Sequence, residues 1–189
     1  MDALGGVFTA FGLSASAGLN AYVPLLILSL TARFTNWFTF SDSWTALSSW
    51  PVIITLVLLG LVEFFADKAP AVNHINDLIQ TFIRPAAGAV LFASSTSAIE
   101  SVHPVLAVIA GLLVAGGVHA TKALAVRPAV TAATAGAGSA PVSMAEDILA
   151  TVLSILSIVI PAVVTGLVII ITSWVIWRFW RRANAARAA

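Results

Sequence analysis

Two pairs of ionisable residues lie inside otherwise apolar stretches of the sequence. Glu63 and Asp67 are four residues apart, and His119 and Lys122 are three apart, so each pair shares one face of a helix. If these stretches cross a membrane, such side chains are costly to bury and mark a site for a solute, an ion or a proton. Ion pairing that fixes the register of the helices explains them as well, provided that the two faces meet. The sequence leaves both roles open.

The segment from Gly12 to Pro24 contains a third group of polar residues and lacks the pattern of a plain helix. It places Gly18 and Asn20 in the middle of an apolar stretch. Interrupted helices of this kind are the best sequence signal of a transporter's binding site, but close packing of small residues beside a proline kink produces the same pattern. The predicted substrate or ion path therefore contains Asn20, Tyr22, Glu63, Asp67, His119 and Lys122.

The composition excludes most soluble functions. The chain has 189 residues, of which 60% are hydrophobic and 9% are charged, whereas a soluble domain has about 25% charged residues. A net charge of +1 without a basic region gives no support to nucleic-acid binding. The chain has no cysteine and none of the common hydrolase, metalloprotease or nucleotide-binding motifs. We therefore expect a membrane protein with no enzymatic activity, no metal, no cofactor and no nucleic-acid partner.

Hydrophobic length divides the chain into six expected membrane spans. A helix of about 20 apolar residues crosses the hydrocarbon core of a bilayer. Prolines at positions 51, 85, 104 and 161 are compatible with the first turn of a helix and mark four of the boundaries. The predicted fold class is an all-α, polytopic helical membrane protein with about six transmembrane helices and a broken first span. The spans are Leu4–Thr31, Trp50–Ala66, Pro85–Ile99, Val105–Val126, Met144–Ile160 and Ala162–Trp180.

The domain organisation expected from these spans is simple. One helical transmembrane domain covers residues 1–182, and a frayed cytoplasmic tail covers residues 183–189. Ser143 and Glu146 have the spacing of a capping box at the beginning of the fifth span. Residues 131–141 are rich in Ala, Gly, Thr and Ser, and a loop, a re-entrant hairpin and a helix extension all fit this composition.

The distribution of basic residues predicts the orientation, because Lys and Arg are enriched on the cytoplasmic side of a membrane. With six spans and both termini in the cytoplasm, eight of the nine Lys and Arg residues lie on the inner side and only Arg33 lies on the outer side. We therefore expect the inner (cell) membrane, with both termini cytoplasmic. The eight inner residues are Lys68, Arg84, Lys122, Arg127, Arg178, Arg181, Arg182 and Arg187.

Several segments have the composition of membrane-surface anchors. Residues 72–82 carry their apolar side chains on one helical face, which predicts a short amphipathic helix lying flat on the cytoplasmic surface. Three tryptophans among the C-terminal arginines are typical of an interfacial anchor. The expected partners are the bilayer and its anionic headgroups, and small-residue helix faces would allow a homo-oligomer. Structural or headgroup anchoring is assigned to Lys68, Arg84, Arg127, Arg178, Arg181 and Arg182.

Four segments together resemble the bacterial multi-pass membrane family catalogued as domain of unknown function 4126. They are Gly12–Leu26, Val62–Pro70, Ile83–Gly88 and His119–Ala123. The Glu-x-x-x-Asp-Lys and Gly-Leu-Asn-Ala-Tyr elements are fairly specific in combination, and the likeness extends from about residue 8 to residue 180. The resemblance implies an integral membrane protein and supplies no substrate or catalytic residue.

Two functions follow as hypotheses. In the first, the protein is a small transporter or channel for an ion or a small solute, which uses the broken first span and the two charged faces. In the second, it is a non-catalytic membrane scaffold or lipid-associated protein whose charged residues are structural. The depth of Glu63 and His119 favours the first hypothesis, because fixing the register of helices does not require such costly positions.

Overall fold

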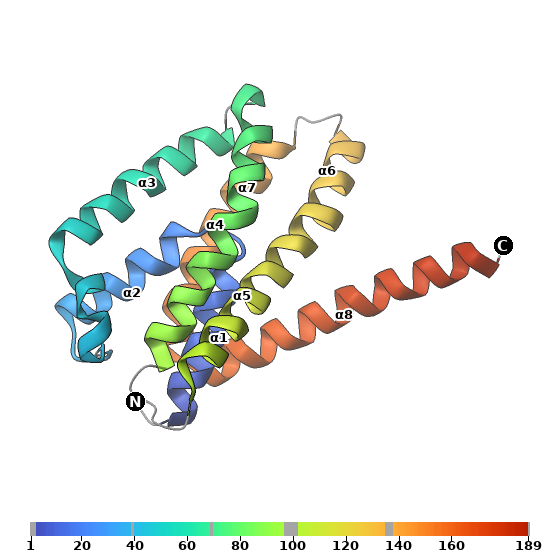
Figure 1. Cartoon of the computed structure of the whole chain (residues 1–189). Helices are drawn as coiled ribbons and strands as arrows, with labels where there is room; N and C mark the ends of the chain where they lie inside the picture. Colours follow the sequence, from blue (N-terminus) through green and yellow to red (C-terminus); the bar gives the residue numbers. More distant parts are fainter. Residues whose placement is uncertain (1–2, 39, 69, 97–101, 135–137, 189) are drawn as a thin grey trace.

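The structure is a computed structural model that describes residues 3–38, 40–68, 70–96, 102–134 and 138–188. These residues form helices and no strands (Figure 1). A 3₁₀ helix, η1 (Asp42–Ser48), and a π-helix, η2 (Lys122–Val126), accompany the α-helices. The α-helices are α1 (Ala3–Ala17), α2 (Tyr22–Phe34), α3 (Trp50–Lys68), α4 (Pro70–Thr96), α5 (Pro104–Thr121), α6 (Arg127–Thr134), α7 (Ser139–Val159) and α8 (Pro161–Ala188).

The side chains are distributed as expected for a helical bundle in lipid. Large apolar side chains on α3, α5 and α7 are exposed, among them Val62, Leu113 and Ile148. Ser16 and Ser154 are instead buried, and their hydroxyl oxygens are hydrogen-bonded at 2.7 Å. The predicted class, an all-α helical membrane protein, is confirmed. Within the described residues, three helical stretches are long and apolar enough to cross a membrane: Trp50–Asp67, Pro104–Thr134 and Ala140–Val159.

The first predicted span is broken, and its two halves form a hairpin. The beginning of α1 lies beside the end of α4, where the rings of Phe11 and Phe92 pack edge to face with centroids 5.1 Å apart. α1 runs antiparallel to α4, so that farther along it Ser14 Oγ donates to the carbonyl oxygen of Gly88 (2.9 Å). α1 ends at Ala17, which is fully buried and therefore lies in the interior of the bundle.

α2 returns toward the end of the bundle at which α1 begins (Figure 1). Near its C-terminal end, the guanidinium of Arg33 lies 4.6 Å from the ring centre of Trp50 and donates to the carbonyl oxygen of Ser48 (2.9 Å). Trp44 of η1 packs against the same apolar cluster as Ala10 of α1. Both outer ends of the α1–α2 pair therefore lie at one end of the bundle, and the tip, residues 18–21, lies inside it. The pair forms a helical hairpin within the bundle.

This hairpin bears on the predicted position of the N-terminus, which stays a prediction. α1 begins at the end of the bundle opposite to Lys122, whereas a full first span would place both at the same end. The count of basic residues cannot distinguish the two arrangements, because Arg33 is the first Lys or Arg in the chain and lies at the outer end in both. If the basic end faces the cytoplasm, α1 begins on the other side of the membrane. A cytoplasmic C-terminus and the inner membrane stay predictions.

Cysteine labelling checks this arrangement in a chain that has no cysteine of its own. We expect single cysteines at Leu4 and Ser43, both exposed, to react with an impermeant maleimide from the same side of the membrane. A cysteine at the exposed Ala133 of α6 should react only from the other side. Reaction of Leu4→Cys from the same side as Ala133→Cys would show that the first segment crosses the membrane once.

The predicted flat amphipathic helix is the first part of a longer helix. α4 is one continuous helix of 27 residues with Pro85 inside it, so residues 72–82 and the predicted third span form a single element. Asn76 and Gln80 are buried (9% and 2% exposed), while Phe82 on the apolar face is 74% exposed. Asn76 and Gln80 face protein while Leu78, Ile79 and Phe82 point outward, because the bundle interior supplies hydrogen-bond partners that lipid cannot. The prediction of a separate surface helix is wrong.

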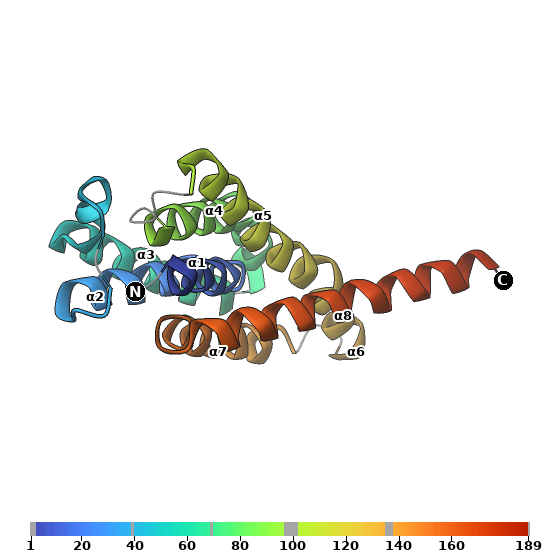
Figure 2. The same cartoon turned by 90° about the horizontal axis from the view of Figure 1, so that it is seen from below.

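The C-terminal elements agree with the predictions in part. α7 ends at Val159 and α8 begins at Pro161, so the two helices are separate, as predicted. Of residues 131–141, positions 131–134 belong to α6 and positions 139–141 to α7, while positions 135–137 lie outside the described residues. α8 projects away from the bundle (Figure 2) and continues to Ala188, so it includes residues 183–188.

Small residues bring α4 and α5 into close contact. A Cβ on Gly111 would overlap the carbonyl oxygen of Gly88, and the Cβ of Ala115 already occupies the space beside Gly88. The face of Gly111 and Ala115 is therefore occupied by α4 within the chain.

Candidate functional site

Charged side chains gather beside the tip of the α1–α2 hairpin. They come from α3, α4, α5, η2, α6 and α7, whose ends or middle turns lie near the tip (Figure 1). Their contacts join helices that are far apart in the sequence. We call this group the charge cluster: Glu63, Asp67, Arg84, His119, Lys122, Arg127 and Glu146.

Arg84 lies at the centre of the charge cluster. Its side chain is 1% exposed, and its Nη2 atom is 3.0 Å from Glu63 Oε1 and 3.9 Å from Asp67 Oδ2. Its Nη1 atom is 3.4 Å from Nδ1 of His119. The sequence assigned Arg84 to structural or headgroup anchoring. The structure places it in the interior, where the two carboxylates of α3 compensate its charge.

The two charged faces are connected through α4. Glu63 and His119 contact Arg84 from either side, and Nε2 of His119 is 3.2 Å from the hydroxyl oxygen of Thr81. Both ring nitrogens of His119 therefore face side chains of α4. Among the described residues Glu63 forms its ion pair with Arg84, and not with His119 or Lys122.

Asp67 connects three further elements. Its Oδ1 atom accepts a hydrogen bond from Nδ2 of Asn76 (2.7 Å), and its Oδ2 atom accepts one from the hydroxyl of Ser143 (3.1 Å). Arg127 Nη2 lies 3.7 Å from the same Oδ2 atom. Ser143 therefore does not cap α7, which begins at Ser139. The predicted capping box is wrong, because its serine is used in a contact with α3.

Lys122 connects the charge cluster to the hairpin tip. Its Nζ atom is 2.6 Å from Glu146 Oε2 and donates to the carbonyl oxygen of Leu19 (3.3 Å). Leu19 follows the C-terminal end of α1, where unpaired carbonyl groups favour a cation. Lys122 begins the π-helix η2, and π-turns inside helices occur frequently at functional sites.

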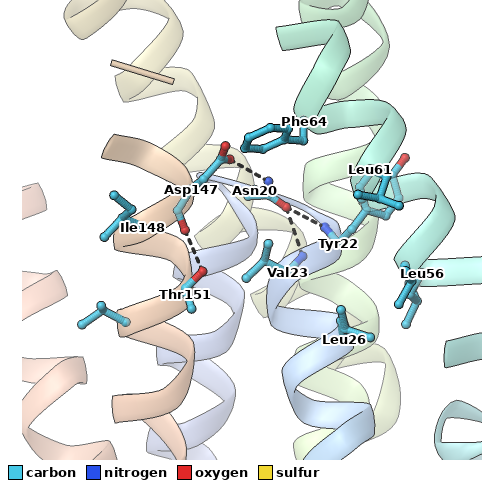
Figure 3. Close-up of a pocket in the computed structure, with 13 residues that line it drawn as sticks. Asn20, Tyr22, Val23, Leu26, Leu56, Leu61, Phe64, Asp147, Ile148 and Thr151 are labelled. Carbon is cyan, nitrogen blue, oxygen red and sulfur yellow. Dashed lines mark hydrogen bonds between the residues drawn. The ribbon is translucent and has the colours of Figure 1, made fainter. Parts of the chain in front are cut away.

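Asn20 holds the other side of the tip (Figure 3). Its Oδ1 atom accepts hydrogen bonds from the backbone N–H groups of Tyr22 and Val23, both at 3.0 Å, at the beginning of α2. Its Nδ2 atom donates to Asp147 Oδ1 of α7 (2.9 Å). The side-chain amide of Asn20 thus pairs with two free backbone N–H groups at the start of α2 and connects them to the carboxylate of Asp147.

A pocket of about 460 Å³ lies between α2, α3 and α7, and we call it the lateral pocket. Its polar lining consists of Asn20, Tyr22, Asp147 and Thr151, gathered near the tip (Figure 3). The predicted path is therefore divided, because Asn20 and Tyr22 line the pocket whereas the other four predicted residues belong to the buried cluster. The apolar lining consists of Val23, Leu26, Leu56, Val57, Gly60, Leu61, Phe64, Ile148 and Val152.

The comparison with family models finds one match. The model described as Domain of unknown function (DUF4126) matches residues 7–182. The chain belongs to this family. The matched range contains the hairpin, the charge cluster and the lateral pocket, so these features lie within the family's domain. Neither the curated proteins nor the solved structures contain a match.

The predicted anchoring residues have different surroundings. Arg127 is at the edge of the charge cluster with its side chain 21% exposed. The guanidinium groups of Arg178 and Arg181 lie 5.4 Å and 4.9 Å from the ring centres of Trp174 and Trp177. This stacking suits the interface region of a membrane. The side chains of Lys68 and Arg182 lie outside the described part of the chain.

Two polar residues of the lateral pocket were not among the path residues predicted from the sequence. Asp147 and Thr151 are four residues apart on α7 and share a face, which is the signal that could have identified them.

In the charge cluster, Glu63 Oε2 and Arg84 Nε are buried and have no hydrogen-bond partner among the described residues. No group of His, Asp and Glu in the described residues has the arrangement of a metal site.

Proposed function

We propose that the protein transports a small ion or solute across the membrane, and that the hairpin tip is the gate between the lateral pocket and the charge cluster. One observation carries the proposal, and it concerns two adjacent residues. The carbonyl oxygen of Leu19 accepts a hydrogen bond from Lys122 of the cluster, while the side-chain amide of Asn20 donates one to Asp147 of the pocket. A small displacement of the tip would therefore change both sites at once.

The ends of α1 and α2 inside the bundle support this proposal. Transporters commonly place discontinuous helices at the substrate site, where the free N–H and carbonyl groups of helix ends interact with charged groups. Glu63 Oε2 and Arg84 Nε, which have no hydrogen-bond partner among the described residues, also support the proposal. A cluster that served only to hold helices together would be destabilised by buried polar atoms without partners.

A scaffold or lipid-anchoring function is the second candidate, and α8 is the observation that favours it. Ile170 and Ile176 of this helix are 66% and 60% exposed. The stacked Trp and Arg side chains near its end suit the headgroup region. In that case the charges would only hold the bundle together, and lipid chains would fill the lateral pocket.

Water access at Thr151 separates the two candidates. Thr151 lines the lateral pocket, whereas Ile155, one turn later on α7, is exposed on the bundle surface. We expect Thr151→Cys in membranes to react with a charged methanethiosulfonate reagent. Ile155→Cys should react about tenfold more slowly or less, because the reactive thiolate forms only in contact with water. Equally slow reaction at both positions would contradict transport and favour the scaffold.

A further inference from the structure

The lateral pocket has room for an organic molecule, and we infer that its ligand is an amphipathic organic cation. The inference rests on the proposed transport function and adds the class of substrate to it. The pocket volume of about 460 Å³ is within the range of sites for drug-sized ligands, roughly 300–1,000 Å³. Such sites are mostly apolar with a few polar groups that fix the orientation of the ligand, and the lining has this composition.

The charge of the lining favours a cation. Among the described residues that line the pocket, Asp147 is the one carboxylate and none is Lys, Arg or His. Phe64 lies next to Asp147 (Figure 3). A cationic group at this end would face a carboxylate and an aromatic ring, and ring faces attract cations.

The apolar walls favour an amphipathic molecule that enters from the bilayer. Val57 and Leu61 line the pocket and are also 40% and 50% exposed on the outside of the bundle. The pocket therefore opens sideways, toward the lipid. A molecule dissolved in the bilayer can enter with its apolar body among the walls and its charge at Asp147. A phospholipid phosphate or a fatty-acid carboxylate fits less well, because its negative charge would meet that carboxylate.

The test compares two ions of similar shape and opposite charge. We expect the full-length protein in nanodiscs to bind tetraphenylphosphonium saturably in isothermal titration calorimetry, with empty nanodiscs as the reference. Tetraphenylborate should bind about tenfold more weakly or less, because it meets Asp147 with the opposite sign. Asp147→Asn should weaken the binding of tetraphenylphosphonium by a similar factor. Gly60→Leu should abolish it, because a Cβ at Gly60 fits at 3.6 Å from Tyr22 and the rest of the side chain fills the pocket.

Two matched substitutions serve as controls. Asp42→Asn removes an exposed carboxylate on η1, and Gly166→Leu adds the same side chain at a glycine of α8 that has open space around it. Both should bind tetraphenylphosphonium as the unaltered protein does. Loss of binding in either control would mean that the effects at Asp147 and Gly60 are not specific to the pocket, and would overturn the inference.

Three further results would overturn it. They are equal binding of the two ions, undiminished binding by Asp147→Asn, and a co-purifying phospholipid that Gly60→Leu displaces when no tetraphenylphosphonium binds. The last result would assign the pocket to a lipid. If binding fails while Thr151→Cys remains reactive, only the substrate class is wrong. If Thr151→Cys is also unreactive, the transport proposal fails with it.

Discussion

Arg84→Met is expected to destabilise the folded protein by about 3–5 kcal/mol, the usual consequence of removing one partner of a buried ion pair. Arg84 is 1% exposed, and its loss leaves Glu63 and Asp67 without the guanidinium that contacts both. Unfolding in mixed micelles of increasing dodecyl sulfate content, followed by circular dichroism, measures the change in the free energy of unfolding. Arg178→Met, at an exposed arginine of α8, is the control and should change that free energy by less than about 0.5 kcal/mol.

A second substitution tests whether Glu63 is the partner of Arg84. Glu63→Gln in the Arg84→Met background should restore much of the lost stability, because the stranded carboxylate is then neutral. Combining Glu63→Gln with Lys122→Met should show weaker coupling, since Lys122 pairs with Glu146. An Arg84→Met variant as stable as the unaltered protein would contradict the buried ion pair.

The sequence placed acidic and basic side chains on two helical faces that would neutralise each other if they met, because isolated charges at membrane depth are costly. It did not identify Arg84 as their centre. Arg84 precedes a proline and follows a polar segment, and this is the pattern of a surface helix that enters the membrane. In the structure α3 and α5 cover the polar face of that segment, through contacts at Asn76 and Thr81. These contacts depend on tertiary packing, which helical periodicity does not encode.

The hairpin could not be predicted from hydrophobic length or from charge. Residues 4–31 are long enough to cross a bilayer once, and the basic residues are distributed in the same way in both arrangements. The interruption near Gly18 and Asn20 was visible in the sequence. A kink and a reversal have the same composition, however, and only the packing of α1 against α4 distinguishes them.

The lateral pocket was predictable only in its polar part. Asn20 and Tyr22 were candidates because an interrupted helix marks them. Asp147 is near the expected beginning of a span, where a solvated acid is the usual explanation. The apolar walls come from α2, α3 and α7, and the space between these helices depends on their tertiary packing.

The second large effect expected is the loss of transport when the lateral pocket is filled. Gly60 lines the pocket, and Gly60→Leu places a side chain inside it without a close contact at Cβ. Because the proposed path includes this space, the substitution should block movement of the ion or solute while the charge cluster and its ion pairs remain in place. Gly166→Leu on α8 adds the same bulk where nothing lies nearby and should have no effect.

The most direct test is a transport current from proteoliposomes on a solid-supported membrane. Concentration jumps of protons, sodium, potassium and tetrapropylammonium are applied in turn at constant ionic strength. We predict a protein-dependent current with at least one of these ions, reduced about tenfold or more in Gly60→Leu, a change of at least about 1.4 kcal/mol in the barrier, and unchanged in Gly166→Leu. No current with any of the ions, or an equal current in Gly60→Leu, would contradict transport through the lateral pocket.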